Sequence, residues 1–524
     1  MKAPSRRKLA SLLGGLAVLA LALPASAAAH GIVGKADLPI PVWLFSWTAA
    51  IVLVVSFVAL STMWTRPQLQ KPRLHALLAL PATPFVHGAP PFRRGVPASE
   101  SGSRPSPSRA APSGSAAVAS TRVASTWGRG ALLEWLAGVI GVALFALVVY
   151  SGFAGAQVTQ ANLSVTFIYV IFWVGVPVAS VLFGDVFRVL NPWRACARAI
   201  AAIARALRRG RPLRAPLSYP RWLGVWPASA GIVGFAWLEL IYVDKDHPST
   251  LAALSLGYFL AMLAGMALFG IEEWESQADA FGVYFNLLSK LSALTWKDGT
   301  LYVRRLLSGV TDLQVGVGTV ALICTQIGTT TFDGFSNGGI WRNNEPSLQS
   351  LFESLGFNAT PAQELAYSVG LVFCILVISA VYRVGILGVR KVTDKYDTNT
   401  LKRTFVHTLV PIAFAYVLAH YFSLLLWQSQ AMIYLASDPL GNGANIFGTA
   451  NFQIDYHIIS YAAIWYVQVA ALVGGHVGGL ALAHDRALVL YRDPEEAVRS
   501  QYWMLAVMVA FTSFGLWLLS AVGT

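Results

Sequence analysis

Charged residues are scarce in this chain. Only 12% of its 524 residues are Asp, Glu, Lys or Arg, about half the usual share of a soluble protein, whereas 56% are hydrophobic. Apolar runs long enough to cross a bilayer recur as far as the C-terminus. We therefore expect an all-α polytopic membrane helix bundle instead of a soluble domain.

Several motifs of common enzyme classes are also missing. The three cysteines, Cys196, Cys324 and Cys374, show no CxxC spacing, so no disulfide framework is expected. The chain has no Walker loop, no GxSxG elbow, no HExxH and no GxGxxG between a strand and a helix. ATP hydrolysis, serine hydrolysis and zincin chemistry therefore have no support in the sequence.

The N-terminus has the pattern of a signal peptide. A basic start and a short apolar stretch lead into small residues with A-x-A spacing, in MKAPSRRKLASLLGGLAVLALALPASAAAHG. Residues 1–29 are predicted to be removed, with cleavage after Ala27 or Ala29. The second choice leaves His30 as the mature N-terminus on the outer side, and residues 30–64 then hold an outer segment and the first transmembrane helix.

About ten transmembrane helices follow the signal peptide. The expected spans are 43–64, 131–151, 162–184, 227–243, 250–271, 308–328, 364–388, 405–429, 457–483 and 501–521. The connections predicted to be inner hold 30 lysine and arginine residues and the outer ones three, as the positive-inside rule requires. The chain is thus expected in the plasma membrane with the mature N-terminus and the C-terminus outside. The net charge of +13 is then mainly an orientation signal, with contacts to membrane lipid and no nucleic-acid partner.

Two non-spanning segments stand out. Residues 65–130 are rich in Pro, Ser, Gly and Ala and are predicted to be a disordered cytoplasmic linker before a nine-helix membrane domain, 131–524. Residues 193–209 place five arginines in one arc of the helical wheel, opposite apolar side chains. This amphipathic helix is expected on the inner membrane surface. The apolar segment 281–296 is interrupted and is interpreted as interfacial.

Two histidines lie inside predicted spans. His476 is framed by the small-residue pairs Gly474/Gly478 and Gly475/Gly479, which allow another helix to approach closely. His420 shares a helix face with tyrosine and tryptophan. Both fall at intermediate depth on spans that run in opposite directions, so we expect the two imidazoles to approach one another directly or through an ion or water. They are candidate metal ligands, with hydrogen-bonded packing histidines as the alternative.

Acidic residues and a histidine gather in the predicted outer connections. Asp455 and His457 precede the span that bears His476, and Asp333 lies in an expected outer loop. The same side holds Glu239, near the outer end of its span, and the turn YVDKDHPS. Such side chains suit a divalent transition metal that activates water, so Asp455, His457 and Asp333 are candidate catalytic residues. The alternative is that each caps a turn or is a solvated charge.

Four segments carry a resemblance to a known family. They are AHGIVGKADLPIPVWLFSWTAAIVLVVSFVAL, TTTFDGFSNG, AHYFSLLLWQSQ and WYVQVAALVGGHVGGLALAHDRAL. They resemble bacterial, largely actinobacterial, polytopic membrane proteins labelled fenitrothion hydrolase. The resemblance covers most of the chain outside residues 65–130 and implies hydrolysis of an organophosphorus triester with release of a phenol. It carries over no catalytic residues.

Two functions are therefore expected as alternatives. The first is an integral membrane hydrolase that cleaves organophosphorus triesters with a bound metal at the outer mouth of the bundle. The second is a permease or a copper-handling protein, in which His420 and His476 line a pathway for a small apolar or metal-ion substrate. In that case an N-terminal His30 captures copper. A third alternative is a scaffold protein of the envelope.

Overall fold

Long apolar helices make up most of the structure, a computed structural model that describes residues 42–70, 74–79, 129–211, 213–297, 300–392, 395–491 and 493–521. Within these ranges eight helices are long and apolar enough to cross a membrane. The spanning stretches are Leu44–Met63, Leu132–Ala154, Leu163–Phe183, Pro248–Phe269, Ala359–Val392, Thr398–Gln428, Tyr461–Tyr491 and Pro494–Leu518. The predicted all-α, multi-pass membrane fold is confirmed.

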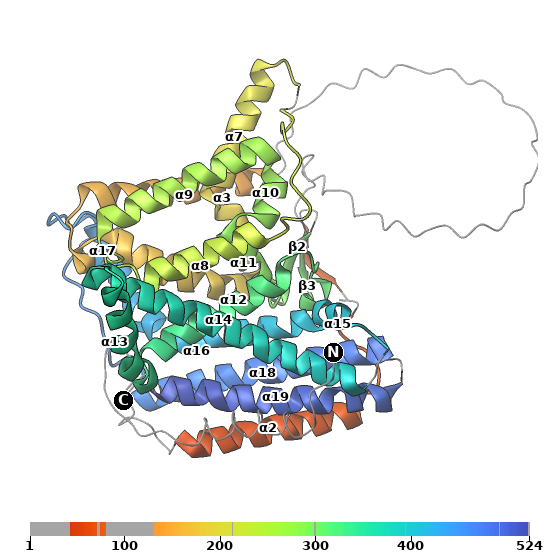
Figure 1. Cartoon of the computed structure of the whole chain (residues 1–524). Coiled ribbons are helices and arrows are strands. Elements are labelled where there is room, and N and C mark those ends of the chain that lie inside the picture. Colours follow the sequence, from red (N-terminus) through yellow and green to blue (C-terminus); the bar gives the residue numbers. More distant parts are fainter. Residues whose placement is uncertain are drawn as a thin grey trace, which may run out of the picture.

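Figure 1 shows the long helices lying side by side, with shorter helices in their connections. The long elements are α2 (Val42–Met63), α3 (Arg129–Ala154), α4–η3–α5 (Leu163–Thr166, Phe167–Gly175, Val176–Phe183), α8 (Trp226–Leu240), α9 (Pro248–Phe269), α12 (Thr319–Ser336), α14 (Ala359–Val392), α15–η5–α16 (Thr398–Phe405, Val406–Leu409, Val410–Gln428), α18 (Tyr461–Tyr491) and α19 (Pro494–Ala521). The connections hold η2 (Thr159–Ala161), α6 (Val186–Leu190), α7 (Pro192–Leu207), α10 (Ile271–Gln277), α11 (Ala280–Ser289), η4 (Val310–Asp312), α13 (Gly339–Ser354) and α17 (Ala431–Ser437).

The two ends of the bundle differ in charge. The basic end holds the connections from α5 to α8, α9 to α12, α14 to α16 and α18 to α19. The far end holds those from α3 to α4, α8 to α9, α12 to α14 and α16 to α18, and their only lysine or arginine residues are Lys245 and Arg342. In Figure 1, α13 and α17 mark the far end, and β2, β3 and α15 the basic end.

Two of the ten predicted spans differ from the structure. The segment predicted at 227–243 forms α8, which at 15 residues is shorter than a bilayer-spanning helix. The segment predicted at 308–328 becomes a loop that ends at Gly318, where φ is 82°, and α12 runs on from there to Ser336. A left-handed backbone cannot continue a right-handed helix, which explains why the helix begins after Gly318 although the apolar run begins at residue 308.

Helix α12 lies in the interior of the bundle. It packs against α14, α8, α16 and α19, and 13 of its 18 residues are buried. Its threonines bond their hydroxyls to carbonyls on the preceding turn, as Thr330 does to Gln326 and Thr331 to Ile327. A polar helix is thus kept away from lipid, while apolar side chains such as Trp47, Ile51 and Val55 of α2 face outward.

Helix α2 is attached to the bundle through a buried carboxylate. It packs on α18 and α19 (Figure 1), and the chain after it crosses Asp485, which is fully buried on α18. The Asp485 carboxylate accepts hydrogen bonds from Trp64 Nε1 (3.1 Å), the backbone N of Gln68 (2.5 Å) and of Leu69 (3.2 Å), and Gln70 Nε2 (2.7 Å). Asp485 therefore fixes the start of the predicted linker.

His484 adds a second bond to this attachment. Its Nε2 lies 2.9 Å from the carbonyl of Trp64, and its Nδ1 lies 3.2 Å from Gln501 Nε2. A carbonyl only accepts and an amide nitrogen only donates, so the tautomer with hydrogen on Nε2 satisfies both contacts.

Part of the predicted linker is ordered. Residues 75–79 form β1 (His75–Ala79), which pairs antiparallel with β3 (Thr300–Val303), and β3 pairs with β2 (Leu294–Lys297). This small sheet lies at the basic end and contradicts a linker that begins at residue 65. Residues 80–128, like the predicted signal peptide and His30, lie outside the described residues.

Helices α10 and α11 form a re-entrant hairpin. The chain turns back at Gly270 (φ 96°), and the Trp274 ring packs where Gly265 of α9 lacks a Cβ. Asp279, at the tip, accepts a hydrogen bond from Tyr258 of α9 at 2.9 Å, eleven residues or about 16 Å before that helix ends. Seven of the ten α11 residues are buried, which corrects the interfacial interpretation of 281–296.

The tip of this hairpin has a complete set of hydrogen bonds. Besides Tyr258, the Asp279 carboxylate accepts from Trp193 Nε1 (2.6 Å), Asn191 Nδ2 (3.1 Å) and the backbone N of Gly282 (3.1 Å). A break between helices is tolerated at membrane depth only where protein groups satisfy it, and Asp279 does so here.

The amphipathic helix is present as α7. Figure 1 shows it running across the direction of α9, and Ile200, Ile203 and Leu207 on it are exposed. This agrees with a helix that rests on a membrane surface. Its arginine face is not wholly solvated, because Arg194 is buried against three glutamates, Glu134, Glu272 and Glu275.

Candidate functional site

A hydrogen-bonded acid–imidazole pair joins α12 to α16 toward the far end of the bundle. Asp333 Oδ2 lies 2.8 Å from His420 Nε2 and accepts a second bond from the Tyr421 hydroxyl at 2.7 Å. The side chains of Asp333 and His420 are 14% and 11% exposed. The pair is therefore enclosed by protein yet open at one edge.

The position of Asp333 corrects the predicted outer loop. The sequence TTTFDGFS continues α12, and the helix ends only at Ser336. Asn337 Nδ2 and Ser336 Oγ both donate to the carbonyl of Asp333, which caps the last turn. Ser336 and Asn337 thus end the helix, and Asp333 lies in its last turn.

Proton positions on His420 follow from its partner. A carboxylate with a neighbouring tyrosine donor is an acceptor, so Nε2 of His420 carries the hydrogen that points to Asp333. Nδ1 is then the basic nitrogen, and among the described residues it has no hydrogen-bond partner. The imidazole is held in one tautomer with its second nitrogen able to take up a proton.

A second carboxylate and a cation lie near this pair. Glu239, close to the end of α8, is near enough to Asp333 for their charges to interact, and Lys245 in the following turn interacts with both. The Lys245 backbone is fixed by its carbonyl, which accepts a bond from the Tyr169 hydroxyl at 2.8 Å. Two carboxylates, one imidazole and one ammonium thus face one another across three helices and a turn.

Two buried donors lie beside Glu239. Trp173 Nε1 interacts with the Glu239 carboxylate, and the Tyr284 hydroxyl has no hydrogen-bond partner within the described residues. Their rings are 5.5 Å apart, and both lie close to Glu239. An unpaired buried donor costs about 1–3 kcal/mol. The open Tyr284 hydroxyl beside a carboxylate therefore leaves a place for water or for a polar group of a ligand.

Trp173 stands on an unusual helix. Residues Phe167–Gly175 form the π-helix η3 within the third span. Such helices are rare and occur often at functional sites, because the widened turn moves side chains out of the regular α-helical positions. Here the widened segment brings Trp173 close to Glu239. We call the group around it the acid–imidazole site; its members are Asp333, His420, Tyr421, Glu239, Tyr284 and Lys245.

His476 lies apart from this site. Its Nδ1 is 2.8 Å from the carbonyl of Leu472 on its own helix, and its ring packs against Tyr416 (6.1 Å) and Phe511 (5.9 Å), which stack on each other. Nε2 has no partner among the described residues. His420 faces α12 and not α18, so the predicted pairing of the two histidines gives way to separate partners for each.

The predicted close helix crossing at His476 is confirmed for one glycine pair. A Cβ on Gly475 would lie 2.7 Å from the Pro411 carbonyl oxygen, and one on Gly479 would lie 2.8 Å from that of Thr408. Gly474 has open space around it, and Gly478 has only ordinary contacts. The 475/479 pair therefore lets α18 approach α16, and the 474/478 pair does not.

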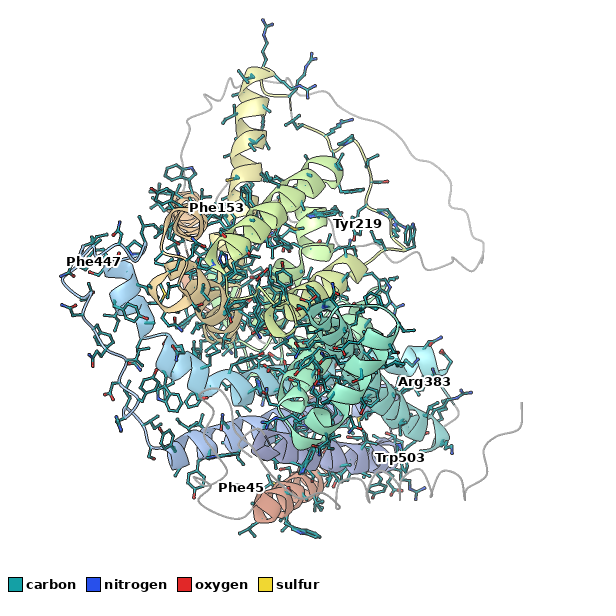
Figure 2. All side chains as sticks on the ribbon, turned by 60° about the vertical axis from the view of Figure 1, so that its left-hand side comes forward. Phe45, Phe153, Tyr219, Arg383, Phe447 and Trp503 are labelled. Carbon is teal, nitrogen blue, oxygen red and sulfur yellow. The ribbon has the colours of Figure 1, made fainter. Side chains whose placement is uncertain are left out.

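The other predicted site residues are in a surface loop. Asp455 and His457 precede α18, which begins at Tyr461, and the His457 side chain is 97% exposed. Asp455 Oδ1 accepts from the backbone N of His457 at 2.7 Å, a local turn. Figure 2 shows Phe447, in the same loop, at the edge of the molecule.

The metal prediction finds no assembled ligand set in the part of the chain that the structure describes. No group of three or more His, Cys, Asp or Glu side chains there is placed to hold a metal ion. Comparisons with family models, curated proteins and solved structures found no match. The resemblance to fenitrothion hydrolases thus stays a prediction.

Proposed function

We propose that this protein is a proton-coupled membrane permease and that the acid–imidazole site binds the proton. The observation that carries the proposal is the Asp333–His420 bond inside the bundle, with Glu239 beside it. Ionisable side chains within membrane helices are energetically costly, and they mark proton and ion pathways in pumps and transporters.

The chemistry of the site suits reversible proton binding. A proton that reaches Nδ1 of His420 converts the neutral imidazole into a cation already bonded to the carboxylate of Asp333. The carboxylate of Glu239 offers a second acceptor, and Lys245 balances part of the negative charge. Each uptake or release changes the net charge of the site by one, which is the change that a coupled permease transmits to its helices.

Two further features support a permease. The bundle contains a discontinuous element, the α10–α11 hairpin, and transporter sites are commonly built where helices are broken. The Tyr284 hydroxyl, which has no hydrogen-bond partner among the described residues, offers a solute oxygen a donor inside the bundle. The proposed orientation places the basic end in the cytoplasm, with the mature N-terminus and the C-terminus outside the plasma membrane.

Purified protein in proteoliposomes tests this function. Proton entry is driven by a potassium diffusion potential and followed with trapped pyranine, with and without a panel of amines, amino acids and metal salts. We expect one solute class to stimulate proton entry, and Asp333→Asn, His420→Gln and Glu239→Gln to reduce that stimulation at least tenfold. The control His457→Gln, in the exposed loop, should stay within twofold of the wild type.

Two results would contradict the permease proposal. If no solute in the panel stimulates proton entry into well-folded proteoliposomes, or if Asp333→Asn keeps the stimulation, the permease proposal is wrong. Folding of each variant is checked by size-exclusion profile and thermal stability in detergent.

A second candidate is the hydrolase implied by the resemblance. The specific observation that favours it is again the Asp333–His420 pair, because a carboxylate that orients an imidazole leaves Nδ1 as a general base for water. This candidate predicts release of the phenol from fenitrothion in detergent, without any gradient, and its loss in His420→Gln. Phenol release with no solute-stimulated proton entry would decide for the hydrolase.

A further inference from the structure

A cavity of about 270 Å³ opens at the basic end of the bundle. One face of α11 lines it, with Val283, Asn286, Leu287 and Lys290 at helical spacing, and Leu322 of α12 lies opposite. The cavity is therefore bordered by the re-entrant hairpin and by the helix that carries Asp333.

Charged side chains surround the cavity, four acidic and two basic. They are Asp185, Glu272, Glu275 and Asp312, with Arg188 and Lys290. Arg188 is bound to Glu272 at 2.6 Å, and Asn286 Nδ2 donates to Asp185 at 2.6 Å. Arg194, just behind this lining, is bound to Glu272 and Glu275, so the carboxylates outnumber the cations by one and the lining attracts positive charge weakly.

The cavity has a fixed wall. Glu275 is buried, and its carboxylate lies 3.0 Å from Nε of Arg194, which also contacts Glu134 and Glu272. Burial raises the pKa of Glu275 to about 7, against the opposing effect of the arginines. The polar lining is thus held by an ion-pair network and is not a chance gathering of surface charges.

The opposite face of α11 belongs to the acid–imidazole site. Tyr284 follows Val283 directly, but its ring packs on Trp173 and its unpaired hydroxyl lies close to Glu239. Phe281 and Leu288 continue this buried face. The width of α11 therefore separates the cavity at the basic end from the site that holds Asp333 and His420.

We infer that the cavity is the second mouth of the same pathway, that α11 is the partition between mouth and site, and that the mouth admits small cations in preference to anions. The inference rests on the proposed function and adds to it the path's other opening and the charge of what passes through it.

Thiol labelling in membrane vesicles tests the mouth without relying on transport. Val283→Cys is placed in a background in which Cys196, Cys324 and Cys374 are replaced by serine or alanine. The probes are the cationic MTSET and the anionic MTSES, each rate normalised to that with a free thiol. Leu288→Cys is the matched control, because it lies on the same helix but is fully buried away from the cavity.

We expect Val283→Cys to react from the basic end, in inverted vesicles, and Leu288→Cys not to react. One net negative charge roughly 8 Å from the thiol, screened by 0.1 M salt, favours the cationic probe about twofold. Asp312→Asn should bring that ratio close to one. Tyr284→Cys should be unreactive from the basic end, which would place the partition between two adjacent residues.

Other outcomes overturn the inference. Labelling of Val283→Cys from the far end, no labelling from either end, or equal normalised rates for the two probes would each contradict it. Leu287→Cys, on the same face, replaces Val283→Cys if that variant does not fold. If proton entry is absent but labelling is as expected, the permease proposal fails and the cation-attracting cavity stands. If proton entry is stimulated but labelling is not as expected, the inferred mouth is wrong and the permease proposal stands.

Discussion

Replacing Asp485 by leucine should release the chain that follows α2. The carboxylate binds four donors, of which the backbone N of Leu69 is buried and the others are partly buried. A buried donor that loses a charged partner forfeits about 2–3 kcal/mol, and a partly buried one that can turn to water about 0.5–1 kcal/mol. The four together amount to about 4 kcal/mol of local stability.

Labelling of Leu69→Cys measures that loss. Leu69 is 4% exposed, so a cysteine there reacts only when the segment opens. A loss of about 4 kcal/mol raises the open fraction, and with it the labelling rate, about a thousandfold. Asp485→Asn keeps the oxygen that binds three of the donors and should raise the rate only about tenfold.

The control is Asp493→Leu, which removes the same charge from an exposed turn at the start of α19. It should leave labelling of Leu69→Cys unchanged. A rate that Asp485→Leu does not alter would refute the reasoning. So would an equal acceleration by Asp493→Leu, which would indicate general loosening of the protein instead of release of one segment.

Three more predictions concern the bundle. Gly475→Leu should prevent folding or lower the melting temperature in detergent by many degrees, whereas Gly474→Leu, with open space around it, should change it little. Arg194→Met removes the nearest cation from the buried Glu275, leaving only Arg188 at 3.9 Å, and should lower the unfolding free energy by about 3 kcal/mol, measured by thermal or denaturant unfolding. His476→Gln should keep both the fold and proton entry, because an amide can donate to the same carbonyl. His420→Gln should keep the fold but lose proton entry. Loss of proton entry in His476→Gln would show that its open nitrogen is used.

Hydrophobicity alone predicts the helices that face lipid. Spans such as α2, α9 and α14 follow from apolar length, because lipid selects for it directly. Hydrophobicity misplaces α12, because neighbouring helices shield its threonines and Asp333 from lipid. It also misses the α10–α11 hairpin, because a re-entrant element is too short to resemble a span and depends on Asp279 for its depth.

The site could be predicted only in part for a similar reason. Asp333, His420 and Glu239 were recognisable as ionisable residues in or near apolar segments. Which of them meet depends on how α8, α12 and α16 are rotated about their axes, and this follows from packing between helices. A wheel drawn for α16 alone relates His420 to other residues of that helix but cannot show that it faces α12 and not α18.

Within the described residues 42–70 and 74–79, helix α2 and the chain after it contact the rest of the protein at several places. Packing on α18 and α19, the Asp485 bonds, and the pairing of β1 with β3 are three separate attachments, and none needs a peptide connection to α3. The protein should therefore assemble from two polypeptides, one ending and the other beginning within 80–128. Co-expressed halves that copurify would make α2 an interchangeable part, which could be labelled or replaced without touching the other helices.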